Sequence, residues 1–109
     1  MTAEGMLRQR RDDALALLAT LERDFAAVVT ASGDSNADDE HDPEGATIAF
    51  ERAQLDSTIA ELRQQVAQLD AALDRVADGT YGVCEVCGLP IPLERLEARP
   101  AARTHVACA

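Results

Sequence analysis

The chain has 109 residues, room for one small domain, and only three aromatic side chains, Phe25, Phe50 and Tyr81. Twenty acidic residues face ten basic ones, all of them Arg, for a formal net charge of −10 at pH 7. So acidic a chain repels phosphate backbones, which argues against nonspecific binding of DNA or RNA. Its apolar content is mainly Ala, Leu and Val, which is typical of long packed helices rather than of a large globular core.

No apolar run approaches the roughly 20 residues that a membrane-spanning helix needs. Residues 1–30 carry charges throughout and lack the uninterrupted apolar core of a signal peptide. We therefore expect a cytoplasmic protein with no membrane partner. The three cysteines are an odd number, which suits a mixed Cys/His metal site better than a set of disulfides.

Two stretches have the apolar spacing of long helices, from about Ala3 to Ala31 and from about Ala46 to Ala77. Asp78-Gly79 supplies a stop for the second, with glycine in the usual position after a helix. Regular steps of three and four residues indicate a coiled-coil seam. The first stripe comprises Leu7, Ala14, Leu18, Leu21, Phe25 and Val28, and the second Ile48, Leu55, Ile59, Leu62, Val66, Leu69, Leu73 and Val76.

The segment between these stretches, Ser32–Gly45, has turn chemistry and a run of acids without a basic residue. These acids are Asp34, Asp38, Asp39, Glu40, Asp42 and Glu44. Two seams joined by such a segment predict an all-α fold, an antiparallel two-helix coiled-coil hairpin. We assign residues 1–79 to this hairpin, with an acidic tip loop at about 32–46, and residues 80–109 to a C-terminal zinc finger.

The zinc site is predicted from two pairs of ligands with the same spacing. Seventeen residues separate Cys84-Glu-Val-Cys87 from His105-Val-Ala-Cys108. Two such pairs predict one tetrahedral Cys3His site with a structural Zn²⁺, because the protein would fill all four positions. Pro92 to Arg99 predicts a short helix between the pairs. A redox Cys-x2-Cys pair and scattered buried cysteines are the alternatives, but redox pairs usually follow a strand, and no strand pattern precedes Cys84.

Direct reading of DNA by the finger is not expected. Residues 79–109 contain three basic and three acidic side chains, whereas a DNA-reading finger normally presents a basic face.

The finger resembles the DksA/TraR zinc-finger family. The resemblance is carried by Tyr81-Gly-Val-Cys-Glu-Val-Cys-Gly-Leu-Pro-Ile, Arg95-Leu-Glu-Ala-Arg-Pro100, Arg103 and His105-x2-Cys108, and the heptad hairpin before it is similar to that family's coiled coil. The resemblance implies a bacterial transcription regulator that binds RNA polymerase directly. It also implies that the acidic coiled-coil tip enters the polymerase's secondary channel and that DNA is not bound.

The chain departs from the family pattern at three places. His105 stands where the third ligand is usually Cys. The Asp-x-x-Asp-x-Ala motif of the family's tip aligns with His41, Glu44 and Ala46, and a one-residue shift would use Asp42 instead. The basic residues with which some members bind ppGpp on the second helix are absent, and Glu61, Gln64, Gln65 and Gln68 stand in that part of the chain, which speaks against shared ppGpp binding.

Two other functions are compatible with these patterns. A coiled-coil adaptor or oligomerisation module, capped by a structural finger, would use the same stripes for another partner. A zinc enzyme is the weakest hypothesis, because it needs an open coordination position and no such position is evident.

Overall fold

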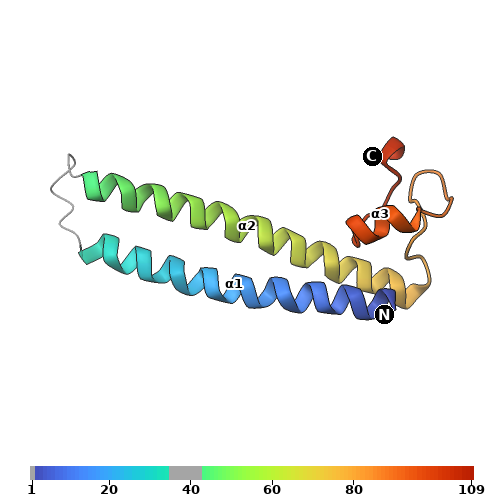
Figure 1. Ribbon diagram of the computed structural model, residues 1–109, viewed down its shortest axis with the longest axis horizontal. Coiled ribbons are helices and arrows are strands. Elements are labelled where there is room, and N and C mark those ends of the chain that lie inside the picture. The colour runs from blue at the N-terminus through green and yellow to red at the C-terminus, as the bar shows by residue number, and fades with distance from the viewer. Residues whose placement is uncertain (1, 35–42) are drawn as a thin grey trace. The chain divides into compact units, whose positions relative to one another are not determined.

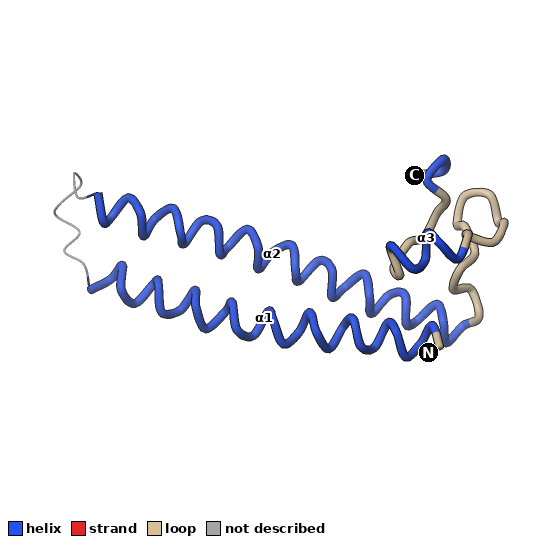
Figure 2. The backbone as a smooth tube through the Cα atoms, viewed as in Figure 1, coloured by secondary structure: helices blue, strands red, loops and turns tan. Residues whose placement is uncertain are grey.

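The structure is a computed structural model that describes the backbone of residues 2–34 and 43–109, and the side chains of residues 2–31 and 45–109. Its elements in chain order are α1 (Ala3–Asp34), α2 (Pro43–Asp78), α3 (Leu93–Ala98) and the short 3-10 helix η1 (Val106–Cys108) (Figure 1). The described ranges contain no β-strand, only an isolated antiparallel bridge between Val83 and Pro90. Figure 2 shows how irregular chain surrounds α3. The predicted all-α class, with two long helices in contact and a C-terminal cysteine and histidine cluster, is confirmed.

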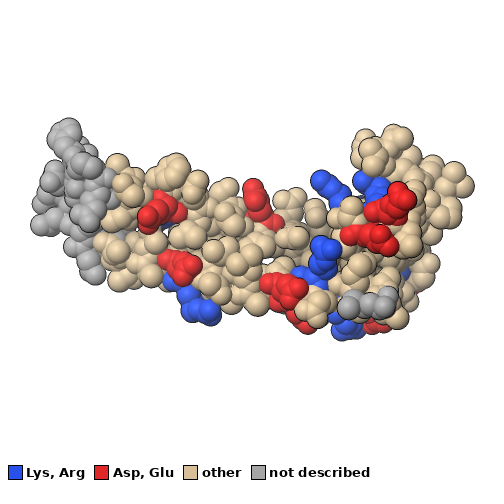
Figure 3. Space-filling view, in the orientation of Figure 1, with Lys and Arg blue, Asp and Glu red and all other residues tan. Residues whose placement is uncertain are grey.

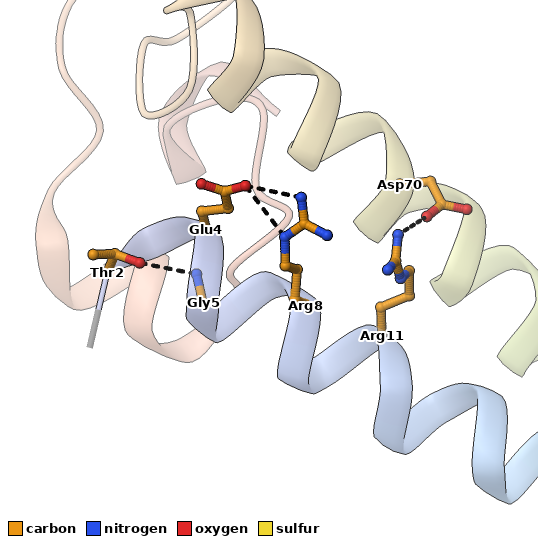
Figure 4. A network of polar contacts seen from close by, with 6 residues as sticks. All are labelled: Thr2, Glu4, Gly5, Arg8, Arg11 and Asp70. Carbon is orange, nitrogen blue, oxygen red and sulfur yellow. Dashed lines mark hydrogen bonds and ion pairs between the residues drawn. The ribbon is translucent and has the colours of Figure 1, made fainter.

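The long helices extend beyond their predicted inner ends. α1 begins at Ala3 and continues past Ala31 to Asp34, and α2 begins at Pro43, before the predicted Ala46. A proline is tolerated in the first turn because an N–H there would have no partner inside the helix. The start of α1 is capped by Thr2, whose Oγ1 accepts a hydrogen bond from the Gly5 N–H at 3.0 Å (Figure 4).

The C-terminal end of α2 closes with the predicted glycine. Gly79 has φ +81°, a backbone conformation that residues with a Cβ rarely adopt. The Thr80 N–H donates to the Arg75 carbonyl at 2.9 Å, and the Gly79 N–H donates to the Val76 carbonyl at 3.3 Å. This pair of bonds is the Schellman motif, which satisfies two of the last carbonyls of a helix. The chain therefore leaves α2 in a defined direction toward the finger.

The chain divides into two compact units, which we call the helical unit (Ala14–Gln64) and the finger unit (Met1–Asp13 with Gln65–Ala109). In the helical unit, the two long helices contact each other through the predicted stripes, where Leu18, Ile59 and Leu62 are buried. Arg63 and Glu22 form an exposed ion pair of 3.4 Å across the helices. The stripes therefore lie on the inner faces, as the heptad spacing predicts.

The finger unit has its own core, which the first turns of α1 share with the end of α2. Leu7, Leu69 and Ala72 are buried together. Four half-buried apolar side chains pack against them, namely Leu73, Val76, Tyr81 and Ala101. Nearby, Arg11 donates to Asp70 at 3.2 Å, joining α1 to α2 (Figure 4). The compact units thus divide the chain differently from the sequence segments 1–79 and 80–109, and that division stays a prediction.

Within residues 2–34 and 43–109, none of the helices combines the length and the apolar character that crossing a membrane requires.

We predict that Leu69→Ala destabilises the protein by about 2–5 kcal/mol, the usual cost of truncating a buried leucine. Leu69 is 4% exposed in the core of the finger unit. Chemical denaturation followed by circular dichroism measures the loss. Leu17→Ala is the matched control because Leu17 is 49% exposed, and it should change stability by no more than about 0.5 kcal/mol. Equal losses in both variants would contradict the described core.

Candidate metal centre

The first pair of candidate ligands lies on a tight turn built around two glycines. The Cys84 N–H donates to the Leu89 carbonyl at 2.9 Å, and the Gly88 N–H donates back to the Cys84 carbonyl at 3.0 Å. Gly82 and Gly88 both have positive φ, +81° and +75°, which glycine adopts without strain. The turn therefore holds Cys84 and Cys87 on one rigid loop.

The second pair is held against this turn by main-chain hydrogen bonds. The Glu85 N–H donates to the Arg103 carbonyl at 3.0 Å, and Arg95 Nε of α3 donates to the Thr104 carbonyl at 2.7 Å. The Cys108 N–H donates to the His105 carbonyl at 3.0 Å, which closes the turn between the last two candidate ligands. Cys84 is also buried against Ile91 and Leu96, which form a small core beside the cluster.

The four predicted ligands come together in one cluster. One ligand atom each from Cys84, Cys87, His105 and Cys108 lies within 4.8 Å of all the others. Cys87 Sγ and His105 Nδ1 are 3.3 Å apart. A tetrahedral zinc ion with usual bond lengths would separate such atoms by about 3.5–3.8 Å, so the arrangement fits one zinc ion after small adjustments. Three soft thiols with one imidazole are also a donor set that zinc prefers.

The thiols of the cluster differ in how readily they lose a proton. Burial raises the pKa of Cys84, but hydrogen bonds from the N–H groups of Cys87, His105 and Val86 outweigh it, and the pKa falls to about 5. Burial, with the nearby sulfurs of Cys84 and Cys87, raises the pKa of Cys108 to about 11. Like charges this close oppose one another, so a divalent cation among them would stabilise all three thiolates together.

An exposed ion pair joins the two arms of the finger, which are the turn that carries Cys84 and Cys87 and the segment that carries His105 and Cys108. Arg103 Nε donates to both Glu85 carboxylate oxygens, at 3.0 and 3.1 Å, and Nη2 donates to Oε2 at 2.9 Å. These bonds from Arg103 hold the pKa of Glu85 below its usual value. Because the pair is exposed, it adds little to the free energy of unfolding, and its main effect is to align the two arms.

The predicted tip residues are not brought into any described site. His41 and Asp42 lie outside the described residues, as does the side chain of Glu44, whose backbone is in the first turn of α2. Ala46 is an exposed residue of α2. The tip assignment therefore stays a prediction.

A groove rich in arginine is a feature of the finger unit that counting charges did not reveal. A cavity of about 410 Å³ is lined by Arg10 of α1, by Gln65, Gln68 and Leu69 of α2, and by residues 95 and 98–103. Arg95, Arg99 and Arg103 are among the latter, so four of the chain's ten arginines border one hollow. On the face drawn in Figure 3, basic side chains lie around α3 together with acidic ones. The balanced charge of residues 79–109 did not reveal these arginines as neighbours, because a net charge does not tell where the charged side chains lie.

Residues 79–109 match a family model described as the prokaryotic dksA/traR C4-type zinc finger. The family description specifies four cysteines, whereas this cluster has three cysteines and His105. The match covers the whole C-terminal segment that contains the cluster.

Two curated proteins are similar over part of the chain. General stress protein 16O of Bacillus subtilis (strain 168) is 44% identical over 73 residues, which are 66% of this chain and 44% of that protein. RNA polymerase-binding transcription factor DksA of Caulobacter vibrioides is 54% identical over 44 residues, which are 40% of this chain and 31% of that protein. The chain thus spans less than half the length of either relative.

A solved structure shares the fold. Transcription factor DksA2 from Pseudomonas aeruginosa superposes with a TM-score of 0.80, covering 96% of this chain and 75% of that chain, at 22% sequence identity. Together with the finger match and the DksA relatives, these findings confirm the resemblance and the single structural zinc of the finger. Residues 79–109 therefore form a zinc finger of the dksA/traR type, and this finger follows two long helices.

Proposed function

We propose that this protein is a bacterial transcription regulator that binds RNA polymerase directly and carries its acidic tip into the polymerase's secondary channel without binding DNA. The observation that carries the proposal is the combination of a DksA/TraR finger with two long helices whose connecting segment is strongly acidic. A relative named for RNA polymerase binding, DksA of Caulobacter vibrioides, supports the choice of partner. With polymerase as the partner, the protein would act in the cytoplasm.

The charge distribution supports an anionic tip as the active element. Residues 34–44 hold six acids and no basic residue. Anionic segments are attracted toward cations and repelled from phosphate, so this segment suits a channel near catalytic metal ions better than a DNA groove. Asp42 and Glu44 are the proposed effectors, with His41 and Ala46 as neighbouring contacts of the tip.

We propose Cys84, Cys87, His105 and Cys108 as the four zinc ligands. With all four positions filled by the protein, no vertex is left for an activated water, and the ion would stabilise the fold rather than catalyse a reaction. Few apolar side chains support residues 80–109, and structural zinc ions typically contribute about 10–16 kcal/mol in small fingers.

An adaptor or oligomerisation module is the second candidate. It is favoured by exposed apolar residues on the finger, where Leu93 is 70% and Val106 is 73% exposed. Exposed apolar side chains are common singly, but several on one small module suit a protein contact. The adaptor would need a partner other than polymerase, which separates the two functions by experiment.

We expect α2 to contribute no shared binding of ppGpp, because uncharged Gln65 and Gln68 stand there. These glutamines border the groove that Arg10 and Arg99 also line. Titration of ppGpp into the complex with polymerase, compared with polymerase alone, tests the expectation that the chain adds no affinity.

Replacing the histidine ligand should show which histidine holds zinc. His105→Ala removes one of four ligands and should lower bound zinc well below one ion per chain, whereas His105→Cys restores the C4 pattern and should keep it. Metal analysis after gel filtration measures the stoichiometry. His41→Ala is the matched control, because the chain has only two histidines. Full zinc in His105→Ala would remove His105 from the ligand set.

Removing the tip charges should separate binding from regulation. The double variant Asp42→Ala with Glu44→Ala should bind polymerase core nearly as well as the parent and lose the transcriptional effect, because the proposed contact acts inside the channel. Pull-down with purified core and in vitro transcription measure the two properties. Asp56→Ala with Glu61→Ala removes the same charge from exposed positions of α2 and should leave both unchanged. Normal regulation by the tip variant would refute the assignment.

Cross-linking should locate the tip on the polymerase. A photoreactive side chain at position 44 should link to residues that line the secondary channel, whereas one at position 97, on exposed α3, should not. Mass spectrometry of the linked peptides identifies the contacts. Cross-links from position 44 to the outer surface only would favour the adaptor.

A further inference from the structure

The ring of His105 is held from two sides. Its Nε2 lies 2.8 Å from the main-chain carbonyl oxygen of Pro90, and its Nδ1 lies 3.3 Å from Cys87 Sγ. A carbonyl oxygen can only accept a hydrogen bond, so Nε2 must carry the proton. A neutral ring then has its free lone pair on Nδ1, the nitrogen that faces the sulfurs.

We propose that His105 binds the zinc ion through Nδ1, and that the Pro90 carbonyl fixes the tautomer and the ring orientation that this requires. The proposal rests on the assignment of His105 as a ligand under the proposed function. Metal-binding histidines commonly donate their other ring N–H to a carbonyl or carboxylate, which orients the ring and increases its basicity. Here the acceptor belongs to the main chain.

The Pro90 carbonyl is itself held in place by the turn that carries the first two ligands. Pro90 pairs with Val83 in the isolated bridge, and the neighbouring Ile91 N–H donates to the Gly82 carbonyl at 2.7 Å. Ile91 is buried in the finger core. The carbonyl therefore has a fixed position before the ion binds, and the first arm of the finger orients the histidine of the second.

Arg95 of α3 supports the same ring through the main chain of the residue before it. Its Nε donates to the carbonyl of Thr104, the residue before His105, at 2.7 Å, and its side chain is half-buried. This bond fixes the main chain from which the imidazole projects. Arg95 is thus a positioning residue for His105 and is not a ligand.

Isotope-edited NMR of the full chain tests which ring nitrogen binds the metal. The zinc is replaced by an NMR-active cadmium isotope, and the histidines are labelled with nitrogen, in a His41→Ala background that leaves His105 alone. We expect cadmium coupling at Nδ1 and a bound proton at Nε2. Coupling at Nε2 would overturn this inference and leave the ligand set intact. Coupling at neither nitrogen would overturn both the inference and the assignment of His105.

The role of Arg95 is tested with a variant that keeps its bulk. Arg95→Met should weaken metal binding by about 10-fold, the lower end for loss of an orienting partner, and should speed exchange of the Nε2 proton. Chelator competition and NMR exchange measure these effects. Arg99→Met is the matched control, because no described contact ties its side chain to the His105 loop. Equal affinity and equal exchange in both variants would remove Arg95 from the positioning role.

Discussion

The side chain of Tyr81 joins the two small cores of the finger unit. It packs against Leu7, Leu69 and Ala72 on one side and against Cys84, Ile91 and Leu96 on the other. Its hydroxyl donates to the Pro100 carbonyl at 2.8 Å, and its burial raises the pKa of the phenol. A chain with only three aromatic residues has few other means of filling such a junction. The approach of the finger to the ends of α1 and α2 depends on this contact.

The direction of the chain on both sides of Tyr81 follows from short-range hydrogen bonds. The Schellman motif at Gly79 ends α2 just before Tyr81, and Arg75 of the last turn donates to the Ala101 carbonyl at 3.3 Å. Arg103 and Glu85 then link the two arms of the finger. Each bond is modest alone, since net contributions are about 1 kcal/mol. Together they bring the two pairs of candidate ligands to one place, where a bound metal ion would add far more.

The charged residues of this protein are distributed unevenly. The chain is strongly acidic, yet four arginines border one groove of the finger unit, and the longest acid run stands between the two long helices. The net charge of the whole chain therefore does not predict the local charge beside this groove.

The sequence by itself determined the helices, their inner faces and the four residues of the cysteine and histidine cluster, because heptad spacing, Gly79 and paired Cys/His spacing are local patterns. It did not reveal the burial of Ala72, which lies off the predicted stripe and packs near Tyr81 and Ala101. The arginine groove and the Pro90 contact of His105 also escaped it. Only the tertiary structure decided these features, because each is a contact between separate segments of the chain. The local sequence around either segment does not indicate such a contact.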